Sequence, residues 1–284
     1  MTSKADILYN YIGFVLYRDF FKGEILDGNL ILILPFVFGA VIGSFLNVCI
    51  HRLPLGLSVV SPPSRCPKCE RHIPFYDNIP IFSYFILMGK CRNCGSPFSF
   101  RYALIELLTG AFAVFLFLKF GLTIELFAYF LFVSALIVIT FIDLEHQIIP
   151  DIISLPGIAI GFALSFILPF PGVLNSVIGL LAGGGILIAI AFGWYFLTGT
   201  EGMGGGDIKL LAMVGAFLGW KSVLLTLLLG SFLGAFVGGI VMLIYGKNSK
   251  HPIPFGPFLA AGAVSYLFFG EELIGWYIMQ MIGV

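Results

Sequence analysis

The stretch Gly202-Met-Gly-Gly-Gly-Asp-Ile-Lys209 separates two long apolar runs of the chain. Its glycines allow backbone conformations that other residues resist. They lead to a single carboxylate, Asp207, at the mouth of the second apolar run. A charge at the edge of a membrane segment is costly and usually functional. We therefore take Asp207 as the first candidate for chemistry and ask which group acts with it.

Apolar runs of about 20 residues recur on both sides of this stretch, and a run of that length is what a helix needs to cross a bilayer. The chain has 284 residues, of which 59% are hydrophobic and 11% charged, whereas a soluble domain is about 25% charged. A membrane barrel would show alternating residues instead of solid runs. The sequence therefore predicts an all-α polytopic membrane protein with about eight transmembrane helices. The runs are 31–50, 102–118, 124–142, 152–168, 173–197, 208–220, 222–245 and 254–269.

The runs divide the chain into an amphipathic segment, 1–30, a first transmembrane helix, 31–50, a polar loop domain, 51–101, and a transmembrane domain, 102–284. The polar loop holds seven of the fifteen basic residues, so the positive-inside rule places it in the cytoplasm. Threading the helices from this loop brings Asp143 and Asp207 to the same cytoplasmic face. Fifteen basic and fifteen acidic residues cancel, so charge gives no reason to expect a nucleic-acid partner.

Four cysteines in the polar loop form two pairs, Cys66-Pro-Lys-Cys69 and Cys91-Arg-Asn-Cys94, with 21 residues between them. Two such knuckles place four thiolates around one tetrahedral zinc ion. A cytoplasmic loop is kept reduced, which argues against disulfides. A redox or catalytic thiol pair is the alternative. We favour a structural zinc site, because four sulfur ligands leave no open position for chemistry.

Asp143 follows an apolar run directly and should lie in the last turn of a helix. A carboxylate there opposes the helix dipole, and no cation stands nearby in the sequence. An ordinary interfacial role suits its neighbours Glu145 and His146 better than it suits Asp143. An unfavourable position of this kind needs a reason.

Asp207 alone has two interpretations: it caps the helix that follows, or it serves catalysis. Gly204, Gly205 and Gly206 favour catalysis, since they leave bare backbone against which an extended substrate can lie. Together, Asp143 and Asp207 form a plausible dyad. Two carboxylates at one site share a proton, so one acts as a base on water while the other protonates a peptide carbonyl.

From about Phe36 to Leu267 the chain resembles the bacterial type IV prepilin peptidases, which are bifunctional leader peptidases and N-methyltransferases. The Gly-x-Gly-Asp motif by itself would also fit presenilin-like proteases and archaeal preflagellin peptidases, and the cysteine loop with its flanks narrows the match. The motifs that carry the resemblance are Gly43-Ser-Phe-Leu-Asn47-Val-Cys-Ile-His51-Arg52-Leu-Pro54, Ser64-Arg-Cys-Pro-Lys-Cys69, Tyr76-Asp77-Asn78-Ile-Pro80, Gly89-Lys-Cys-Arg-Asn-Cys94, Arg101-Tyr102, Glu106-Leu-Leu-Thr109, 143–151 and Gly204-Gly-Gly-Asp207-Ile-Lys209.

This resemblance implies a GxGD-type aspartic membrane protease with Asp143 and Asp207 as the catalytic pair and 102–284 as its peptidase domain. The implied substrates are type IV prepilins and the pseudopilins of type II secretion, cut after a glycine at the cytoplasmic face of the bacterial inner membrane. The same enzyme is then expected to methylate the new amino terminus with S-adenosylmethionine. The loop domain 51–101 is expected to be linked to that second reaction.

Contacts for the two substrates are less directly indicated. Pilin leaders are basic, so we expect the acidic Glu145, Asp151 and Glu201 to contact them. Glu106 is a lone acid in an apolar run, which makes it a candidate by default. With its polar neighbours it would line a pocket for the methyl donor; equally, the same residues would dock the zinc loop onto the helices. These neighbours are Asn47, Arg52, Asp77, Asn78, Ser83, Arg101 and Tyr102.

Two other classes of protein fit parts of this pattern. One is a proton-coupled transporter with Asp143 and Asp207 as relay acids, although both acids are predicted at one face and not at the midplane. The other is a zinc-binding pilus assembly factor without chemistry, in which the cysteine loop binds partners and the acids are incidental.

Overall fold

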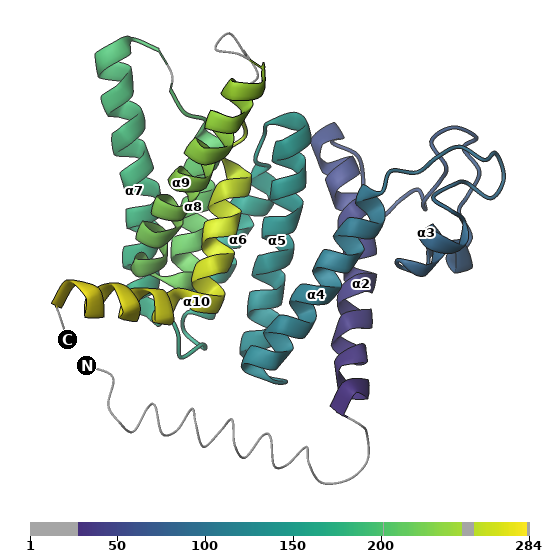
Figure 1. Cartoon of the computed structure of the whole chain (residues 1–284), viewed down its shortest axis with the longest axis horizontal. Helices are drawn as coiled ribbons and strands as arrows, with labels where there is room; N and C mark the ends of the chain where they lie inside the picture. The colour runs from purple at the N-terminus through teal and green to yellow at the C-terminus, as the bar shows by residue number, and fades with distance from the viewer. Residues whose placement is uncertain (1–27, 201, 246–252, 283–284) are drawn as a thin grey trace.

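A computed structural model describes residues 28–200, 202–245 and 253–282 of the chain, and within them the fold is helical with no strand (Figure 1). The predicted amphipathic segment 1–30 therefore lies almost wholly outside the described residues. The helices, in chain order, are α2 (Gly28–Arg52), α3 (Phe82–Ile86), α4 (Arg101–Phe120), α5 (Ile124–His146), α6 (Asp151–Leu164), α7 (Val173–Thr198), α8 (Gly205–Leu218), α9 (Trp220–Tyr245) and α10 (Gly256–Ile282), with short 3-10 turns at Leu53–Leu55 and Phe75–Asn78.

A helix forms at each of the eight predicted apolar runs, but not all of them are long enough to span a bilayer. Among the described residues, five helices have the length and composition to cross: α2, α4, α5, α7 and α9. Helices α6 and α8 have 14 residues each, or about 21 Å at 1.5 Å per residue, against a hydrocarbon core of about 30 Å. The all-helical membrane architecture is confirmed, and the count of eight spans is not.

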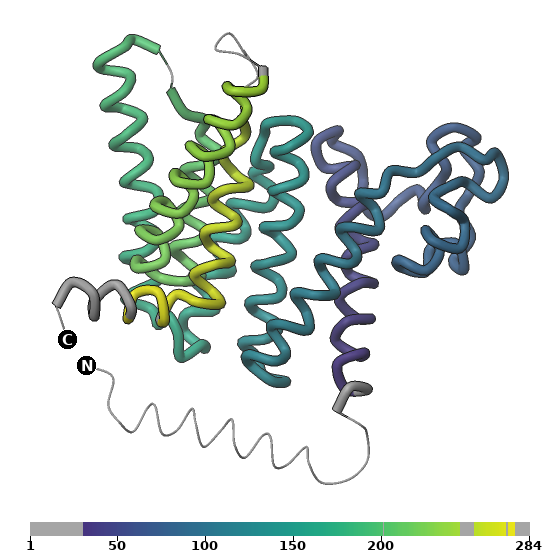
Figure 2. The backbone as a smooth tube through the Cα atoms, in the orientation of Figure 1, coloured from purple at the N-terminus to yellow at the C-terminus, as the bar shows by residue number. Residues whose placement is uncertain are grey.

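Helix α5 stands between two groups of helices (Figure 2). It packs against α2 and α4, which carry the cysteine loop, and against α6 and α10 on its other side. Phe132 of α5 stacks on Phe217 of α8, with ring centroids 4.7 Å apart. This arrangement puts the end of α5, with Asp143, beside the start of α8.

Helix α8 is the buried centre of the second group, since all its residues from Leu210 to Leu218 are buried. Two glycines of α7 let it approach closely: a Cβ at Gly179 would overlap the backbone at Gly215, and one at Gly183 would overlap the backbone at Leu211. Close glycine-mediated packing is the usual way for membrane helices to associate. A short helix held on all sides gives Asp207, in its first turn, a fixed position.

Candidate functional site

Asp143 lies in the last turn of α5 and is buried, with 5% of its surface exposed. Gln147 ends the helix in a left-handed conformation and donates its N–H to the Asp143 carbonyl. The Asp143 carboxylate accepts a hydrogen bond of 2.9 Å from the backbone N–H of Gly256, the first residue of α10. The start of α10 thus supplies the positive partner that the sequence around Asp143 lacks, because a helix N-terminus favours an anion.

Asp207 lies in the first turn of α8 and lines the same pocket as Asp143. One pocket brings the two carboxylates together. Its wall combines four segments that are far apart in the sequence: the end of α5, the α5–α6 connection, the glycine stretch, and the start of α10. The lining residues are Asp143, 147–149, Asp151, 202–207, Lys209 and 253–255.

The glycine stretch forms one side of this pocket. Gly204 precedes α8 in extended conformation and Gly205 begins the helix; a Cβ at either would meet nothing within 4 Å. Gly206 differs, because a Cβ there would lie 2.8 Å from Cβ of Ile149. The open backbone is therefore Gly204 and Gly205, while Gly206 also packs the loop onto α8. Two of the three glycines, Gly205 and Gly206, belong to the first turn of α8.

The acidic residues expected to contact a basic leader have different surroundings. Asp151 lines the pocket and pairs with Lys209, with 2.6 Å between its carboxylate oxygen and Nζ. Glu145 does not line the pocket, because its carboxylate is paired with Arg101 at the start of α4. Glu201 lies outside the described residues. Only Asp151 of the three is seen in the pocket, and it already has a cation beside it.

The four cysteines meet at the tip of the loop domain. The sulfur atoms of Cys66, Cys69, Cys91 and Cys94 all lie within 4.8 Å of one another, and those of Cys66 and Cys94 are 3.8 Å apart. The two knuckles have the same backbone pattern, each closed by an antiparallel bridge, Arg65 with His72 and Lys90 with Pro97.

The surroundings of Cys66 and Cys94 favour thiolates, whereas those of Cys69 do not: the backbone N–H of Arg71 lowers the pKa of the Cys69 thiol, but burial and the neighbouring cysteine sulfurs outweigh it and raise that pKa to about 11. The backbone N–H of Cys69 and the hydroxyl of Ser96 lower the pKa of the Cys66 thiol to about 6. The Ser96 hydroxyl likewise lowers the pKa of Cys94. Four sulfurs in this arrangement fit a tetrahedral zinc ion with Zn–S distances of about 2.3 Å.

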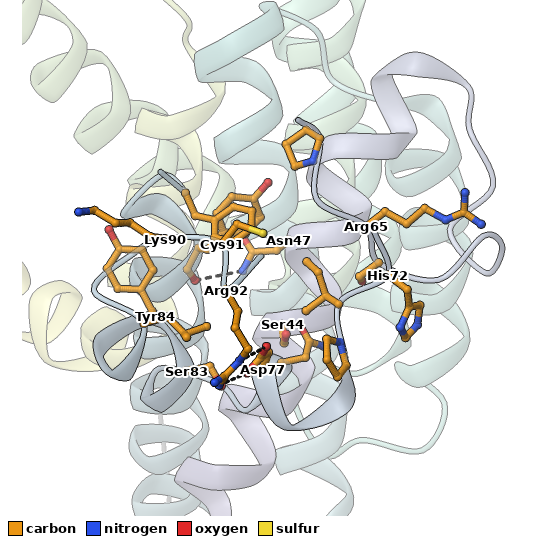
Figure 3. A pocket seen from close by; sticks show the side chains of 18 of the residues that line it. Ser44, Asn47, Arg65, His72, Asp77, Ser83, Tyr84, Lys90, Cys91 and Arg92 are labelled. Atoms are coloured by element: carbon orange, nitrogen blue, oxygen red, sulfur yellow. Dashed lines mark hydrogen bonds and ion pairs between the residues drawn. The ribbon is translucent and has the colours of Figure 1, made fainter. Parts of the chain in front are cut away.

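A second cavity lies between the loop domain and helices α2 and α4 (Figure 3). Of the eight polar residues expected around a methyl donor, seven line it, among them Asn47, Arg52, Asp77, Asn78 and Glu106. Arg101 is the exception, because it is not among the lining residues and its guanidinium is paired with Glu145. Ser83 and Tyr102 line the cavity as well.

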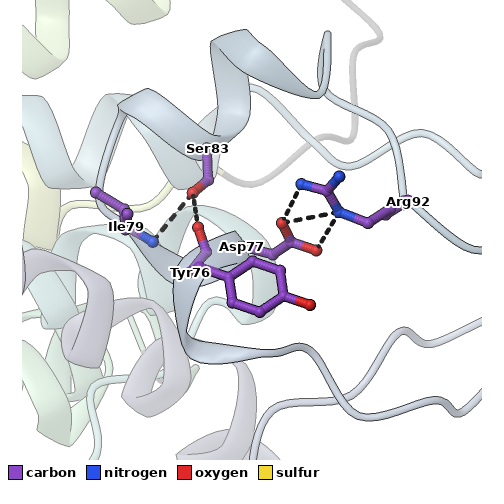
Figure 4. A network of polar contacts seen from close by, with 5 residues as sticks. All are labelled: Tyr76, Asp77, Ile79, Ser83 and Arg92. Carbon is purple, nitrogen blue, oxygen red and sulfur yellow. Dashed lines mark hydrogen bonds and ion pairs between the residues drawn. The ribbon is translucent and has the colours of Figure 1, made fainter.

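Asp77 is held by Arg92 through a two-pronged ion pair (Figure 4). The Arg92 guanidinium donates to both carboxylate oxygens, at 2.6 to 3.0 Å, and holds the pKa of Asp77 below its usual value. Beside this pair, Ser83 donates to the Tyr76 carbonyl and accepts the N–H of Ile79. The cavity wall is therefore fixed by polar contacts within the loop domain.

Glu106 joins the loop domain to the membrane helices. Its carboxylate accepts the N–H of Ile81 at 2.7 Å, and Ile81 has a φ of 65°, an unfavourable conformation for a β-branched residue. Asn47 donates to the carbonyl oxygens of Tyr102 and Gly43. Its own Oδ1 is buried and has no partner within the protein, which leaves an acceptor for a bound ligand.

Sequence reasoning missed Gly256 and Arg92. The run Pro254-Phe-Gly-Pro257 indicates a break in a helix, but nothing in the sequence says that the amide at this break faces Asp143. Arg92 lies between the candidate zinc ligands Cys91 and Cys94, and nothing in the sequence indicates that its guanidinium binds Asp77.

Comparison with known protein families gives two adjacent matches. A model described as the bacterial peptidase A24 N-terminal domain matches residues 37–120. A model described as the type IV leader peptidase family matches residues 130–239. The first covers α2, the cysteine loop and α4, and the second begins within α5 and ends within α9, so it includes Asp143 and Asp207.

Curated relatives agree with these matches. Proteins named prepilin leader peptidase/N-methyltransferase are 37% identical in Aeromonas hydrophila, over 88% of this chain and 94% of the relative, and 36% identical in Pseudomonas aeruginosa, over 84% and 91%. One of the same name in Myxococcus xanthus is 40% identical over 78% of this chain and 66% of its own length. No solved structure matches.

Proposed function

Because this chain belongs to the type IV leader peptidase family and is a prepilin peptidase that is also an N-methyltransferase, we propose that Asp143 and Asp207 are its catalytic pair. The observation that carries the proposal is that both line one pocket although they are 64 positions apart in the sequence. The measurement that tests it is cleavage of a purified prepilin by enzymes in which either aspartate is replaced by asparagine.

The two carboxylates have different surroundings, which assigns their roles. Asp143 accepts the N–H of Gly256 at the start of α10, and both features favour its ionised form. Asp207, beside that negative charge, then holds the shared proton. Asp143 removes a proton from a water molecule, and the oxygen of that water attacks the scissile carbonyl carbon. At the same time Asp207 protonates the carbonyl oxygen, which gives a tetrahedral intermediate. When the C–N bond of this intermediate breaks, the proton held by Asp143 passes to the departing amine, and one hydroxyl proton of the intermediate returns to Asp207 as the new carboxyl group forms, which restores the dyad.

We place the cleavage segment of the pilin along Gly204 and Gly205. Their backbone is open to the pocket, and Ile253, Pro254 and Phe255 supply an apolar wall to it. Of the three acidic residues, Asp151 is the best supported contact for the leader. A basic side chain of the leader would take the place of Lys209 at the Asp151 carboxylate. Glu145 and Glu201 remain weaker proposals, since the first is paired with Arg101 and the second lies outside the described residues.

Replacing Gly205 by leucine should abolish most cleavage while leaving stability unchanged. A Cβ at this position meets no atom within 4 Å in the free enzyme, and the leucine side chain beyond it would occupy the space that we assign to the substrate. The expected result is a large increase in KM for a prepilin, measured in detergent, with an unchanged thermal unfolding midpoint. Gly239→Leu on α9, which also has open space around it, is the matched control. Equal cleavage by Gly205→Leu and Gly239→Leu would exclude Gly205 as part of the substrate-binding surface.

Replacing Gly256 by alanine should lower kcat for cleavage with little effect on KM. A Cβ at Gly256 would lie 2.6 Å from the Asp143 carboxylate, so the carboxylate must move away from the N–H that orients it. Loss of one such orienting contact costs roughly 10- to 100-fold in rate, as for displaced catalytic groups generally. Methyl transfer to a pilin cleaved beforehand serves as the folding control. A normal kcat, or a loss confined to KM, would contradict the positioning role.

For methyl transfer we propose the cavity beneath the cysteine loop. The residues that would hold S-adenosylmethionine are Asn47, through its unpaired Oδ1, together with Asn78 and Glu106. When bound, that molecule supplies an electrophilic methyl group for the new pilin amine. Asp77 and Arg92 keep the cavity wall in place through their ion pair, and Arg52 does so by donating to the carbonyls of Ser58 and Pro62. Arg101 acts outside the cavity, as the partner of Glu145.

We also propose that a zinc ion at the four cysteines is structural, since all four ligands come from the protein. Substrates are prepilins and type II secretion pseudopilins in the bacterial inner membrane, with both sites at the cytoplasmic face, where basic residues of the loop gather. An enzyme that cleaves and methylates leaves the transporter and the non-catalytic assembly factor without support.

A further inference from the structure

One end of the cysteine loop domain carries a cluster of exposed apolar side chains. On α3, Phe82, Phe85 and Ile86 are 68%, 63% and 73% exposed, and their i, i+3, i+4 spacing puts them on one face. Ser83 occupies the opposite face, where it is buried and hydrogen bonded to the loop backbone. Ile79 and Met88 extend the exposed apolar surface on either side of the helix. A cluster of this kind on a small domain marks an interaction surface; we call these five residues the α3 patch.

The part of the same domain that carries the cysteines is more polar. Its exposed residues include the charged Arg65, Lys68, Glu70 and Arg71. The domain therefore has a charged zinc end, around the cysteines, and an apolar surface on α3. A domain standing wholly in water has no reason for this division, whereas a domain that crosses from water into lipid does.

Helix α3 lies alongside α2 and α4, between the upper and lower ends of these helices as drawn, and not beyond them (Figure 1). The cavity that the loop covers reaches down α2 from Arg52 to Ser44, which is about 12 Å along the helix axis at 1.5 Å per residue. On α4, Glu106 receives the N–H of Ile81, and Glu106 is about 7 Å from the start of the helix at Arg101. Ile81 immediately precedes α3, so α3 lies at a depth of several ångströms inside the span.

The adjacent surfaces of α2 and α4 at this depth are apolar and face outward. Phe45, next to Ser44, is 49% exposed, and Leu107, next to Glu106, is 46% exposed. Both helices are long and apolar enough to span a membrane. An apolar surface on α3 at the same depth is continuous in character with their lipid-facing surface.

We propose that the α3 patch is inserted into the cytoplasmic leaflet of the bilayer, so that the cysteine domain is a membrane-embedded cover for the cavity beneath it. Burying the patch in acyl chains removes its apolar surface from water. The inserted patch also shields from lipid the side of the cavity where Glu106 and Asn47 lie. The zinc end stays in the aqueous phase. The new amino terminus of a membrane-bound pilin would then reach the cavity without leaving the leaflet.

Photo-crosslinking from the patch tests this insertion. Benzoylphenylalanine is placed at Ile86 in one enzyme and at Phe82 in a second, each reconstituted in liposomes of phosphatidylethanolamine and phosphatidylglycerol. After irradiation, lipid adducts on the protein are counted by mass spectrometry. The matched control carries the same group at Val60, which is 86% exposed in the same domain but follows the end of α2. We expect several-fold more lipid adduct at positions 86 and 82 than at 60.

Three results would overturn the proposal. One is lipid adduct at both patch positions no higher than at Val60. Another is a crosslink to a second copy of the chain in place of lipid. The third is a crosslink to added prepilin at positions that form no lipid adduct without it, which would make the patch a docking surface for the substrate and not for lipid. Zinc content and cleavage activity of each enzyme, compared with the unsubstituted protein, verify that it is folded. If the substitution at one patch position prevents folding, the enzyme labelled at the other position still gives the answer.

Discussion

Replacing either Asp143 or Asp207 by asparagine should lower the rate of prepilin cleavage by at least about 10³-fold, since general acid–base catalysis alone contributes about 10²- to 10⁴-fold. The substitution keeps the size of each side chain, so the pocket is preserved. Asparagine at 143 still offers an oxygen to the Gly256 N–H, yet it cannot take a proton from water. At 207 it cannot deliver one to the carbonyl oxygen. The measurement is the appearance of the shortened pilin in detergent solution under single-turnover conditions.

Two controls separate lost chemistry from lost structure. Methyl transfer to a pilin cleaved beforehand should continue at the wild-type rate, because its proposed cavity lies between α2, α4 and the loop, away from both aspartates. Asp151→Asn removes a carboxylate from the same pocket, but one that is exposed and paired with Lys209. Its kcat should stay within a few-fold of wild type. Cleavage at the wild-type rate in either Asp143→Asn or Asp207→Asn would refute the dyad.

The dyad also has a kinetic consequence, because the two residues act as a unit. The rate of the double variant should be close to that of the less active single variant. The effects of catalytic residues that work together are strongly non-additive. Losses that multiplied in the double variant would indicate that Asp143 and Asp207 contribute independently. This comparison uses the same assay and therefore needs no new substrate.

The sequence indicated the helical membrane class because solid apolar runs of about 20 residues are typical of helices that cross a bilayer. It also singled out the acids and cysteines, since rare polar residues in an apolar chain stand out and their spacing carries chemical information. Asp143 and Asp207 line one pocket, as their shared cytoplasmic face suggested. The four sulfurs lie together, as their paired spacing suggested. What these residues do remains a prediction.

The partners of charged residues could not be predicted in the same way. Lys209 pairs with Asp151, and Arg101 with Glu145, because helices distant in sequence end side by side. The amide of Gly256 reaches Asp143 only because α10 begins beside the end of α5. Such pairings depend on how helices pack, which local sequence patterns do not encode. The count of eight spans is not confirmed at α8 for a related reason: an apolar run indicates burial without saying in what, and the 14-residue α8 is buried by neighbouring helices.

Loss of the metal site should affect methyl transfer far more than peptide cleavage. Cys66→Ser removes one of four thiolates, and we expect the purified protein to fall from about one zinc per chain to nearly none. The loop between α2 and α4 contains only short helices and few buried apolar side chains. A domain of this kind depends on its metal, whose binding supplies about 10–16 kcal/mol in small zinc domains. Without zinc the loop should unfold.

An unfolded loop would dismantle the methyl-transfer cavity, because most of the residues that line it, including Cys91, Asp77 and Arg92, belong to the loop. Cleavage should be reduced less, since α5, α8 and α10 pack together without the loop, which the Arg101–Glu145 ion pair joins to the end of α5. The comparison is zinc by elemental analysis, methyl transfer to a pilin cleaved beforehand, and cleavage of an intact prepilin, with Cys49→Ser as the matched control. Full methyl transfer by a zinc-free enzyme would mean that the loop holds its fold without metal, and that the cysteines have another task.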